Sequence, residues 1–398
     1  MKRFFLLASF LFALCLTALA QTNQPFHRQV LKSEVLGEER VILVRTPAGY
    51  EAGTQRFPVL YLTDGDAHIA HTSATIEFLA RNGRMPEMIV VGINNTDRTR
   101  DLSPTKAAMT RPDGSQQEFP TAGGANNFLK FIETELMPKI ESQYRTQPFR
   151  VLAGHSFGGL FALHAFLTKT DLFNGYIAVS PTMHWDDKYP VRKAEEFFKG
   201  RPELNKTLFV TLANEGGEML VGFNQFKNLL GKQWPKGFAW EAMLMEDEDH
   251  GSVVMRSHYF GFRKIFEGWQ IPQNLAAGGV QAVEEHYKKL SARFKYSVLP
   301  PELLMNNLGY RLMGERKIEE AVAVFKTNVE RYPGSANVYD SLAECYENMG
   351  KLELAKSNYE KAVQVGEQTK DPNLQTYKTN AARVTEALKK NAQAKGNN

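Results

Sequence analysis

The stretch GHSFGG at residues 154–159 decides the fold, because it places a serine in the pattern Gly-x-Ser-x-Gly. Residues 149–153 precede it as a short apolar run that predicts a buried strand, and residues 160–167 follow as an apolar run that predicts a buried helix. A strand, a sharp turn and a helix around a serine form the setting of a nucleophile elbow. Glycines are needed beside the serine, because side chains there would collide with the strand and helix that meet at the turn. We therefore predict that Ser156 is a nucleophile.

A serine hydroxyl reacts at neutral pH only with a general base beside it. In the fold that uses this elbow, an acid and then a histidine follow the serine, each just past a later strand. Residues 238–245 alternate like a strand and run into an acidic loop that ends at His250, which we predict to be the base. His27 and His164 lack such a setting, and His155 is expected to point away from the nucleophile.

The acid of the triad is expected in the loop after the preceding strand, which we predict at residues 206–212. Two glutamates lie in that loop, and we favour Glu218 over the alternative, Glu215. Asp247 and Asp249 are interpreted as a solvated run that leads into the histidine loop. A site that works with serine and histidine alone remains a further alternative.

An oxyanion hole needs two backbone N–H groups aimed at the developing negative charge. One is expected from Phe157, the residue after the nucleophile. The other is expected from the loop at residues 64–68, which follows a predicted strand at residues 57–63, and Asp66 is the candidate donor. The alternative interpretation of this loop is an ordinary Asp-Gly turn.

Three further residues are candidates for contact with substrate. The long polar stretch at residues 94–126 is expected to line the cleft as a loop. Within it, Arg98 and Arg100 suit an anionic or catecholate substrate, and the alternative is that they pair with neighbouring aspartates. Trp185 is expected to wall the pocket, with a plain core position as its alternative.

No metal or cofactor site is predicted. His68 and His71 lie near Asp64 and Asp66, but this spacing is not a strong ligand pattern and no cysteine or further histidine clusters there.

Several stretches occur in an order that resembles a known family: residues 58–66, 98–104, 123–138, 154–159, 180–185 and 249–251. Over about residues 26–270 the chain resembles the esterase D-like ("Putative esterase") family of α/β-hydrolases. That family includes ferric-enterobactin and salmochelin esterases, feruloyl esterases and mycolyltransferases. The resemblance implies a mostly parallel sheet flanked by helices.

The same resemblance implies a catalytic triad of Ser156 and His250 with Glu218 or Glu215 as the acid. It also implies the N–H groups of Phe157 and Asp66 as oxyanion donors. The sequence departs from the family pattern in the acid loop, which offers two glutamates where one is needed.

The N-terminus predicts export. Residues 1–20 combine a basic start, an apolar core and an Ala-Leu-Ala ending, which is typical of a secretory signal cleaved after Ala20; a membrane anchor is the alternative. Loss of Lys2 and Arg3 lowers the net charge from +4 to +2, which argues against nucleic acid as the main partner. Cys345 then remains alone, so no internal disulfide is expected. We predict a periplasmic or secreted bacterial protein without a membrane segment after cleavage.

A second domain is indicated by repetition at a spacing of 34 residues, which is typical of tetratricopeptide helix pairs. The pairs that show it are Leu308 and Leu342, Ala321 and Ala355, and Phe325 and Tyr359. Helices are expected at about residues 280–294 before the repeats and 373–390 after them. The predicted organisation is therefore a signal peptide at 1–20, an α/β-hydrolase domain at 21–275 and an all-α repeat domain at 276–398.

We predict a serine esterase that hydrolyses a small-molecule carboxylic ester through an acyl-enzyme, with siderophore or hydroxycinnamate esters as the substrates indicated by analogy. Acyl transfer to an alcohol by the same site is one alternative. A non-catalytic protein that works through its repeats is the other. The repeats are expected to bind a protein or peptide partner, or to mediate self-association.

Overall fold

The computed structural model describes residues 26–110, 114–232 and 235–396, so the expected signal peptide lies outside the described residues. The chain divides into two compact units, one up to Gln270 and one from Ile271. The sequence prediction placed this boundary a few residues later, at 275. Each unit is described separately below.

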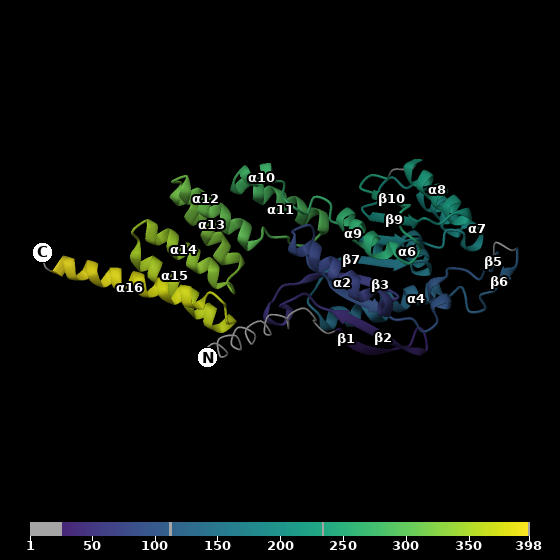
Figure 1. Cartoon of the computed structure of the whole chain (residues 1–398), viewed down its shortest axis with the longest axis horizontal. Coiled ribbons are helices and arrows are strands. Elements are labelled where there is room, and N and C mark those ends of the chain that lie inside the picture. The colour runs from purple at the N-terminus through teal and green to yellow at the C-terminus, as the bar shows by residue number, and fades with distance from the viewer. Residues whose placement is uncertain (1–25, 111–113, 233–234, 397–398) are drawn as a thin grey trace, which may run out of the picture. The chain divides into compact units, whose positions relative to one another are not determined.

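The first unit is built on a sheet with the strand order β1-β2-β4-β3-β7-β8-β9-β10. Its strands are β1 (His27–Ser33), β2 (Glu38–Arg45), β3 (Phe57–Thr63), β4 (Ile89–Ile93), β7 (Thr146–His155), β8 (Gly175–Val179), β9 (Thr207–Ala213) and β10 (Ala239–Met245). β2 runs antiparallel to β1 and β4, and all other pairings are parallel. Figure 1 shows β1 and β2 at one edge of the unit and β10 toward the other. The expected mostly parallel sheet is confirmed.

Helices connect the parallel strands. They are α2 (Gly65–Arg81), α3 (Arg98–Leu102), α4 (Ala125–Phe131), α5 (Met137–Gln143), α6 (Phe157–Thr168), α7 (Trp185–Phe198), α8 (Gly217–Lys232) and α9 (Val253–Ile265). Shorter turns are the 3₁₀ helices η1 (Tyr50–Ala52) and η3 (Thr170–Leu172), and a π-helical turn η2 (Ile132–Leu136) joins α4 to α5. None of the described helices is long and apolar enough to cross a membrane.

Helices cover both faces of the sheet, because side chains alternate along the buried strands. On one face Leu152 and Tyr176 join a core cluster with Phe161 of α6. On the other face Ile177 lies so close to Gly261 of α9 that a Cβ atom on that glycine would stand 2.8 Å from the isoleucine side chain. α2 packs beside α9. The carboxyl ends of the central strands, and the loops that follow them, thus emerge between two helical layers.

The stretch at residues 94–126 is more ordered than the expected loop. It holds α3 and a separate two-stranded ribbon of β5 (Met109–Thr110) and β6 (Gln116–Gln117). Asp97 caps α3 by accepting a hydrogen bond from the backbone N–H of Arg100 at 3.0 Å.

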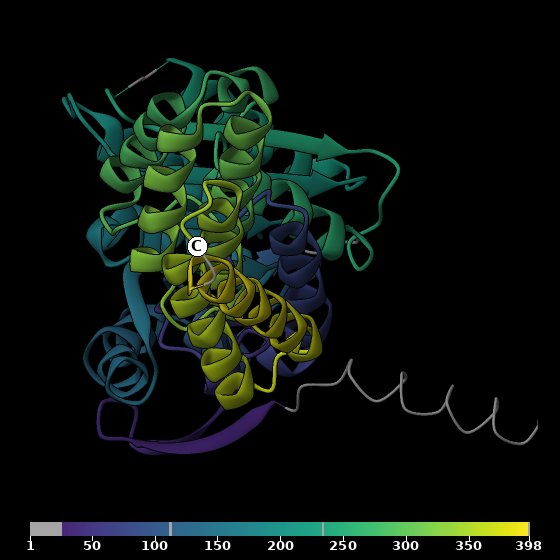
Figure 2. The ribbon, with the colours of Figure 1, turned by 90° about the vertical axis from the view of Figure 1, so that its left-hand side faces the viewer.

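The second unit is all-helical, and its successive helices from α12 to α16 lie side by side (Figures 1 and 2). It contains α10 (Gln273–Ala277), α11 (Val280–Phe294), α12 (Glu302–Gly314), α13 (Ile318–Arg331), α14 (Ala336–Asn348), α15 (Leu352–Thr369) and α16 (Leu374–Gly396). The residues that repeat at 34-residue spacing are all buried. Gly309 permits the close crossing of α12 and α13, because a Cβ atom there would lie 2.5 Å from the Phe325 ring.

Candidate active site

The turn between β7 and α6 holds Ser156 in an unusual conformation, with φ 59° and ψ −116°. A non-glycine residue rarely adopts this region, and such strain is typical of functional turns. The collisions expected at the flanking glycines are confirmed. A Cβ atom on Gly154 would strike the backbone of Gly158, and one on Gly158 would strike the side chain of Thr63.

His250 lies in the loop between β10 and α9, and its imidazole is paired. Its Nδ1 lies 2.7 Å from Oε1 of Glu215. The ring also packs against the ring of His155, with centroids 4.5 Å apart, which brings His250 beside the residue that precedes Ser156. Within the described ranges, the Ser156 hydroxyl itself makes no hydrogen bond. In structures without substrate, catalytic hydrogen bonds are often long or absent.

The loop that carries His250 is shaped by its acidic residues. The Asp249 carboxylate accepts hydrogen bonds from the N–H groups of Gly251 at 2.8 Å and Ser252 at 2.7 Å. Asp247 pairs with Arg256 on α9. Asp247 and Asp249 are thus engaged within the loop, and the carboxylate that contacts the His250 ring is that of Glu215.

Glu215 and Glu218 have different surroundings. Glu215 follows β9 and its side chain is 18% exposed. Burial acts to raise its pKa, but the hydrogen bond and charge of His250 and the Ser180 hydroxyl outweigh burial, so the pKa lies below its usual value. Glu218 lies in the first turn of α8 with its side chain 64% exposed, and it pairs with Lys188 at 2.6 Å. The geometry favours Glu215 as the partner of His250, whereas the sequence favoured Glu218.

Asp66 and Phe157 lie at the starts of two helices. Asp66 is the second residue of α2 and Phe157 is the first of α6. N–H groups in the first turn of a helix have no partner within that helix. α2 begins abruptly because Asp64 is left-handed, with φ 53°, and because Gly65 touches the backbone of Gly92 so closely that a Cβ atom would clash. The N–H groups of Asp66 and Phe157 therefore have no partner within their own helices and can donate to an oxyanion.

The two arginines predicted to meet substrate are paired within the protein. Arg98 binds the Asp64 carboxylate, with Nε 2.6 Å from Oδ1, and also donates to the carbonyl of His155. Arg100 binds Asp101 and Glu38. Protein partners do not exclude a substrate role, which stays a prediction for both.

Trp185 is fully buried beside the elbow. Its indole N–H donates to Oγ1 of Thr105 at 3.0 Å. Its ring meets the rings of Phe157 and Phe119 edge to face, at centroid distances of 5.3 and 5.4 Å. Trp185 thus takes the core position that was its alternative, and the partly exposed rings of Phe157 and Phe119 pack against it next to the Ser156 turn.

The structure gathers further histidines beside His250, which the sequence analysis did not foresee. The rings of His68 and His155 lie 5.5 Å apart, and those of His68 and His71 lie 5.3 Å apart. Burial lowers the pKa of His155 to about 4, and the neighbouring charges of His250 and His68 act in the same direction. No group of three or more metal-ligating side chains is arranged to hold a metal ion among the residues described.

Comparison with known proteins finds a family match within each of the two units. Residues 33–215 match the family described as "Putative esterase", and residues 336–366 match a tetratricopeptide repeat. The siderophore triacetylfusarinine C esterase of Aspergillus fumigatus is 31% identical over 278 residues, covering 60% of this chain and 92% of that enzyme. The ferri-bacillibactin esterase BesA of Bacillus subtilis is 35% identical over 184 residues, covering 42% of this chain and 60% of that enzyme.

A solved structure agrees with the sequence matches. An IroE-like serine hydrolase from Shewanella oneidensis superimposes with a TM-score of 0.68 at 31% identity, covering 77% of this chain and all of that one. The chain therefore belongs to the "Putative esterase" family of serine hydrolases with the α/β-hydrolase fold, and a helical region with a tetratricopeptide repeat follows its hydrolase unit.

Proposed function

We propose that this chain is a serine esterase with Ser156 as nucleophile, His250 as general base and Glu215 as the acid that orients the base. The observation that carries the proposal is the 2.7 Å contact between His250 Nδ1 and the Glu215 carboxylate, beside the strained serine turn. A carboxylate at Nδ1 holds the proton on that nitrogen, so that Nε2 can accept the proton of a serine.

The proposed reaction has two halves. Ser156 Oγ attacks the ester carbonyl carbon while His250 Nε2 takes the hydroxyl proton, and the N–H groups of Phe157 and Asp66 stabilise the resulting oxyanion. The C–O bond to the alcohol breaks, His250 returns the proton to the leaving oxygen, and an acyl-enzyme remains. Water then attacks the acyl carbon while His250 takes its proton, the bond from that carbon to Ser156 Oγ breaks, and His250 returns the proton to Oγ as the acid leaves.

As substrate we propose a siderophore ester. The support is that BesA and the triacetylfusarinine C esterase are named for siderophore esters. The rings of Phe119 and Phe157, which are partly exposed and backed by the buried Trp185, would suit aromatic groups of a substrate. A hydroxycinnamate ester presents the same kind of ring and is the alternative.

The first experiment measures hydrolysis of short p-nitrophenyl esters by the mature protein and by Ser156→Ala. The proposal expects turnover that the variant loses at least about 10³-fold with an unchanged circular dichroism spectrum. Turnover retained by Ser156→Ala, or the absence of both turnover and fluorophosphonate labelling of Ser156, would exclude the proposal. Ester products formed from an added alcohol would instead indicate acyl transfer.

The second experiment compares kcat/KM for enterobactin with kcat/KM for methyl ferulate. A ratio of about 100 in favour of enterobactin would support the siderophore assignment, because it corresponds to about 2.7 kcal/mol of preferential transition-state binding. The reverse ratio would assign the hydroxycinnamate class.

Two further assignments are part of the proposal. The match of residues 336–366 to a tetratricopeptide repeat supports a protein partner, or self-association, for the second unit. The signal-like residues 1–20 support export to the periplasm or beyond. Mass spectrometry of the protein recovered from the periplasm should find Gln21 as the first residue.

A further inference from the structure

The guanidinium of Arg98 bridges two loops of the candidate site. Its Nε and Nη2 bind the two carboxylate oxygens of Asp64 at 2.6 and 3.1 Å, and Nη2 also donates to the carbonyl oxygen of His155 at 3.1 Å. Asp64 follows β3, and His155 is the last residue of β7. One planar group is thus bonded to the ends of two different strands.

Each of these contacts lies next to a proposed oxyanion donor. Asp64 caps α2, whose second residue is Asp66, and His155 is two residues before Phe157. The Asp64 carboxylate also touches the elbow, because a Cβ atom on Gly158 would lie 3.0 Å from its Oδ2. The guanidinium carbon of Arg98 lies 5.6 Å from the centre of the Phe157 ring.

The Asp64 carboxylate has little contact with water. Its side chain is 6% exposed, and Nδ2 of Asn95 donates to Oδ1 at 2.6 Å in addition to Arg98. A buried carboxylate without its cation would be strongly unfavourable, so the ion pair holds the left-handed turn at Asp64 in place.

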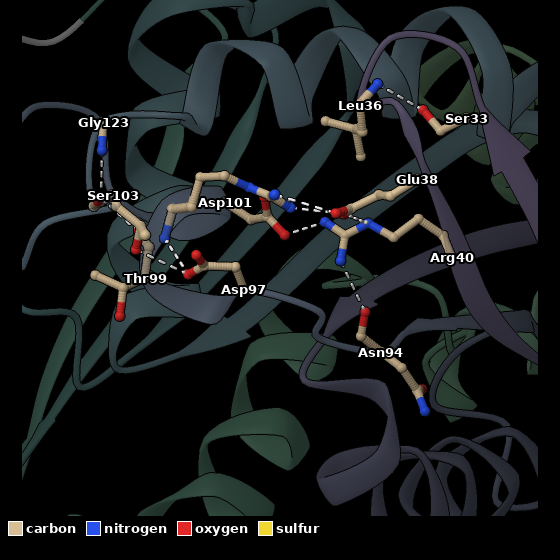
Figure 3. A network of polar contacts seen from close by, with 12 residues as sticks. Ser33, Leu36, Glu38, Arg40, Asn94, Asp97, Thr99, Asp101, Ser103 and Gly123 are labelled. Carbon is tan, nitrogen blue, oxygen red and sulfur yellow. Dashed lines mark hydrogen bonds and ion pairs between the residues drawn. The ribbon is translucent and has the colours of Figure 1, made fainter.

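The helix that carries Arg98 is itself anchored, as Figure 3 shows. Asp101 of α3 pairs with the fully buried Arg40 of β2, and Glu38 of β2 binds Arg100 at 2.6 Å. Asp97 caps the start of α3. Arg98 therefore projects from a short helix that is held in place by the buried pair of Asp101 with Arg40 and the partly buried pair of Arg100 with Glu38.

We propose that Arg98 is a positioning residue that sets the separation of the two oxyanion donors, Phe157 N–H and Asp66 N–H. The proposal rests on the serine esterase function proposed above. Oxyanion stabilisation depends on donors that are already in place when charge develops, and these two come from separate loops. Arginine suits the task because its rigid fork binds a carboxylate with two bonds and still has a donor for a carbonyl; lysine has no such fork.

This role differs measurably from substrate binding, which the sequence also allowed for Arg98. A side chain that binds substrate equally in ground and transition states changes KM. One that places the oxyanion donors changes kcat and the affinity for a tetrahedral mimic. The Arg98 side chain is 36% exposed, so both roles are sterically open.

The test measures kcat and KM for a p-nitrophenyl ester, and the inhibition constant of a boronic acid, in Arg98→Lys, Asp64→Asn and the double variant. We expect Arg98→Lys to lower kcat by about 10- to 100-fold with KM changed by less than about threefold. Boronate affinity should fall by about the same factor as kcat/KM. The double variant should be no slower than the slower single variant, because the two substitutions break the same bridge between Arg98 and Asp64.

Arg150→Lys is the matched control. Arg150 lies on β7, the strand that ends at His155, and binds a surface carboxylate, Glu141, with Nε 3.1 Å from Oε1. Its kcat should stay within about twofold of the unmodified value, because exposed pairs contribute little. Thermal unfolding of every variant separates loss of fold from loss of function, and Asp64→Asn tests the bridge if Arg98→Lys is unstable.

Two results would overturn the inference while leaving the esterase in place. A raised KM with unchanged kcat would make Arg98 a substrate contact. Values of kcat within twofold of the unmodified enzyme for both single variants would show that the bridge does not position the donors. If the unmodified protein itself lacks Ser156-dependent turnover, the proposed function fails, and this inference fails with it.

Discussion

Glu215 and Glu218 are separated by two residues and have opposite environments, which makes their substitution informative. Glu215 is partly buried and binds His250, so Glu215→Gln should lower kcat by roughly 10²- to 10⁴-fold. The amide carries no charge to stabilise the imidazolium that forms during attack, and it can favour the wrong tautomer of the ring. Steady-state hydrolysis of a p-nitrophenyl ester at neutral pH measures the effect.

Glu218→Gln is the control for the same chemical change. Glu218 is exposed and pairs with Lys188, and exposed ion pairs contribute little, so kcat should stay within about twofold. A larger loss in Glu218→Gln than in Glu215→Gln would assign the acid to Glu218. Small losses in both would indicate a site that works with serine and histidine alone.

At the scale of residues, the sequence predicts what a local pattern encodes. Ser156 and His250 follow from a motif and from a strand that runs into a loop. The choice between Glu215 and Glu218 does not follow from a local sequence pattern, because it depends on where α8 begins. Gly217 is left-handed, with φ 59°, and starts the helix that takes Glu218 toward Lys188. Arg98 contacts Asp64, which lies 34 positions before it, and His155, which lies 57 positions after it. No local sequence pattern reveals contacts over such separations.

At the scale of elements, the turn between β7 and α6 should tolerate no side chain at Gly154. A Cβ atom there meets the backbone of Gly158, which cannot move without shifting α6. We expect Gly154→Ala to lower the free energy of unfolding by about 1–3 kcal/mol. Displacement of Ser156 should also lower kcat by about tenfold or more. Urea unfolding and ester hydrolysis measure the two effects.

Gly231→Ala is the matched control, because Gly231 lies near the end of α8 with no atom within 4 Å of an added Cβ. Alanine is the better helix former by about 0.5–1 kcal/mol, so this variant should be slightly more stable and fully active. Equal destabilisation by both substitutions would contradict the proposed crowding at Gly154.

Elements defined by strong periodicity were predicted well. The strand expected at residues 57–63 is β3, and the helix expected at residues 280–294 is α11. α3 was not predicted, because five residues carry no helical period and its stability depends on Asp97 and on the buried pair of Asp101 with Arg40. The left-handed backbone of Asp186–Lys188 near the start of α7 was not predicted either.

At the scale of the whole molecule, a set of buried and partly buried histidines makes stability depend on pH. Burial lowers the pKa of six described histidines: His68, His71, His155, His164, His184 and His258. They stay neutral in the folded protein, whereas the unfolded chain takes up protons near the usual value of about 6.5. The unfolded state therefore binds more protons below that value, and the free energy of unfolding must fall as the pH falls.

His164 isolates this effect away from the serine turn. Its ring contacts the Tyr189 hydroxyl at 2.8 Å and the Asn126 side chain at 2.9 Å. Burial lowers its pKa to about 4, and the positive charge of Lys193 acts in the same direction. Lowering the pH from about 7 to about 4 should therefore cost about 3 kcal/mol through this residue.

His164→Gln removes that titration, so we expect its free energy of unfolding to decline less steeply between pH 7 and pH 4, by up to about 3 kcal/mol. Urea unfolding at several pH values measures both curves. The variant should be less stable near pH 7, because the amide cannot keep both ring contacts, and the two curves should converge as the pH falls. Glu215, whose pKa is lowered, also destabilises the folded state in acid, but it does so equally in both proteins and cancels in the comparison. Parallel curves would show that His164 does not contribute to the acid sensitivity.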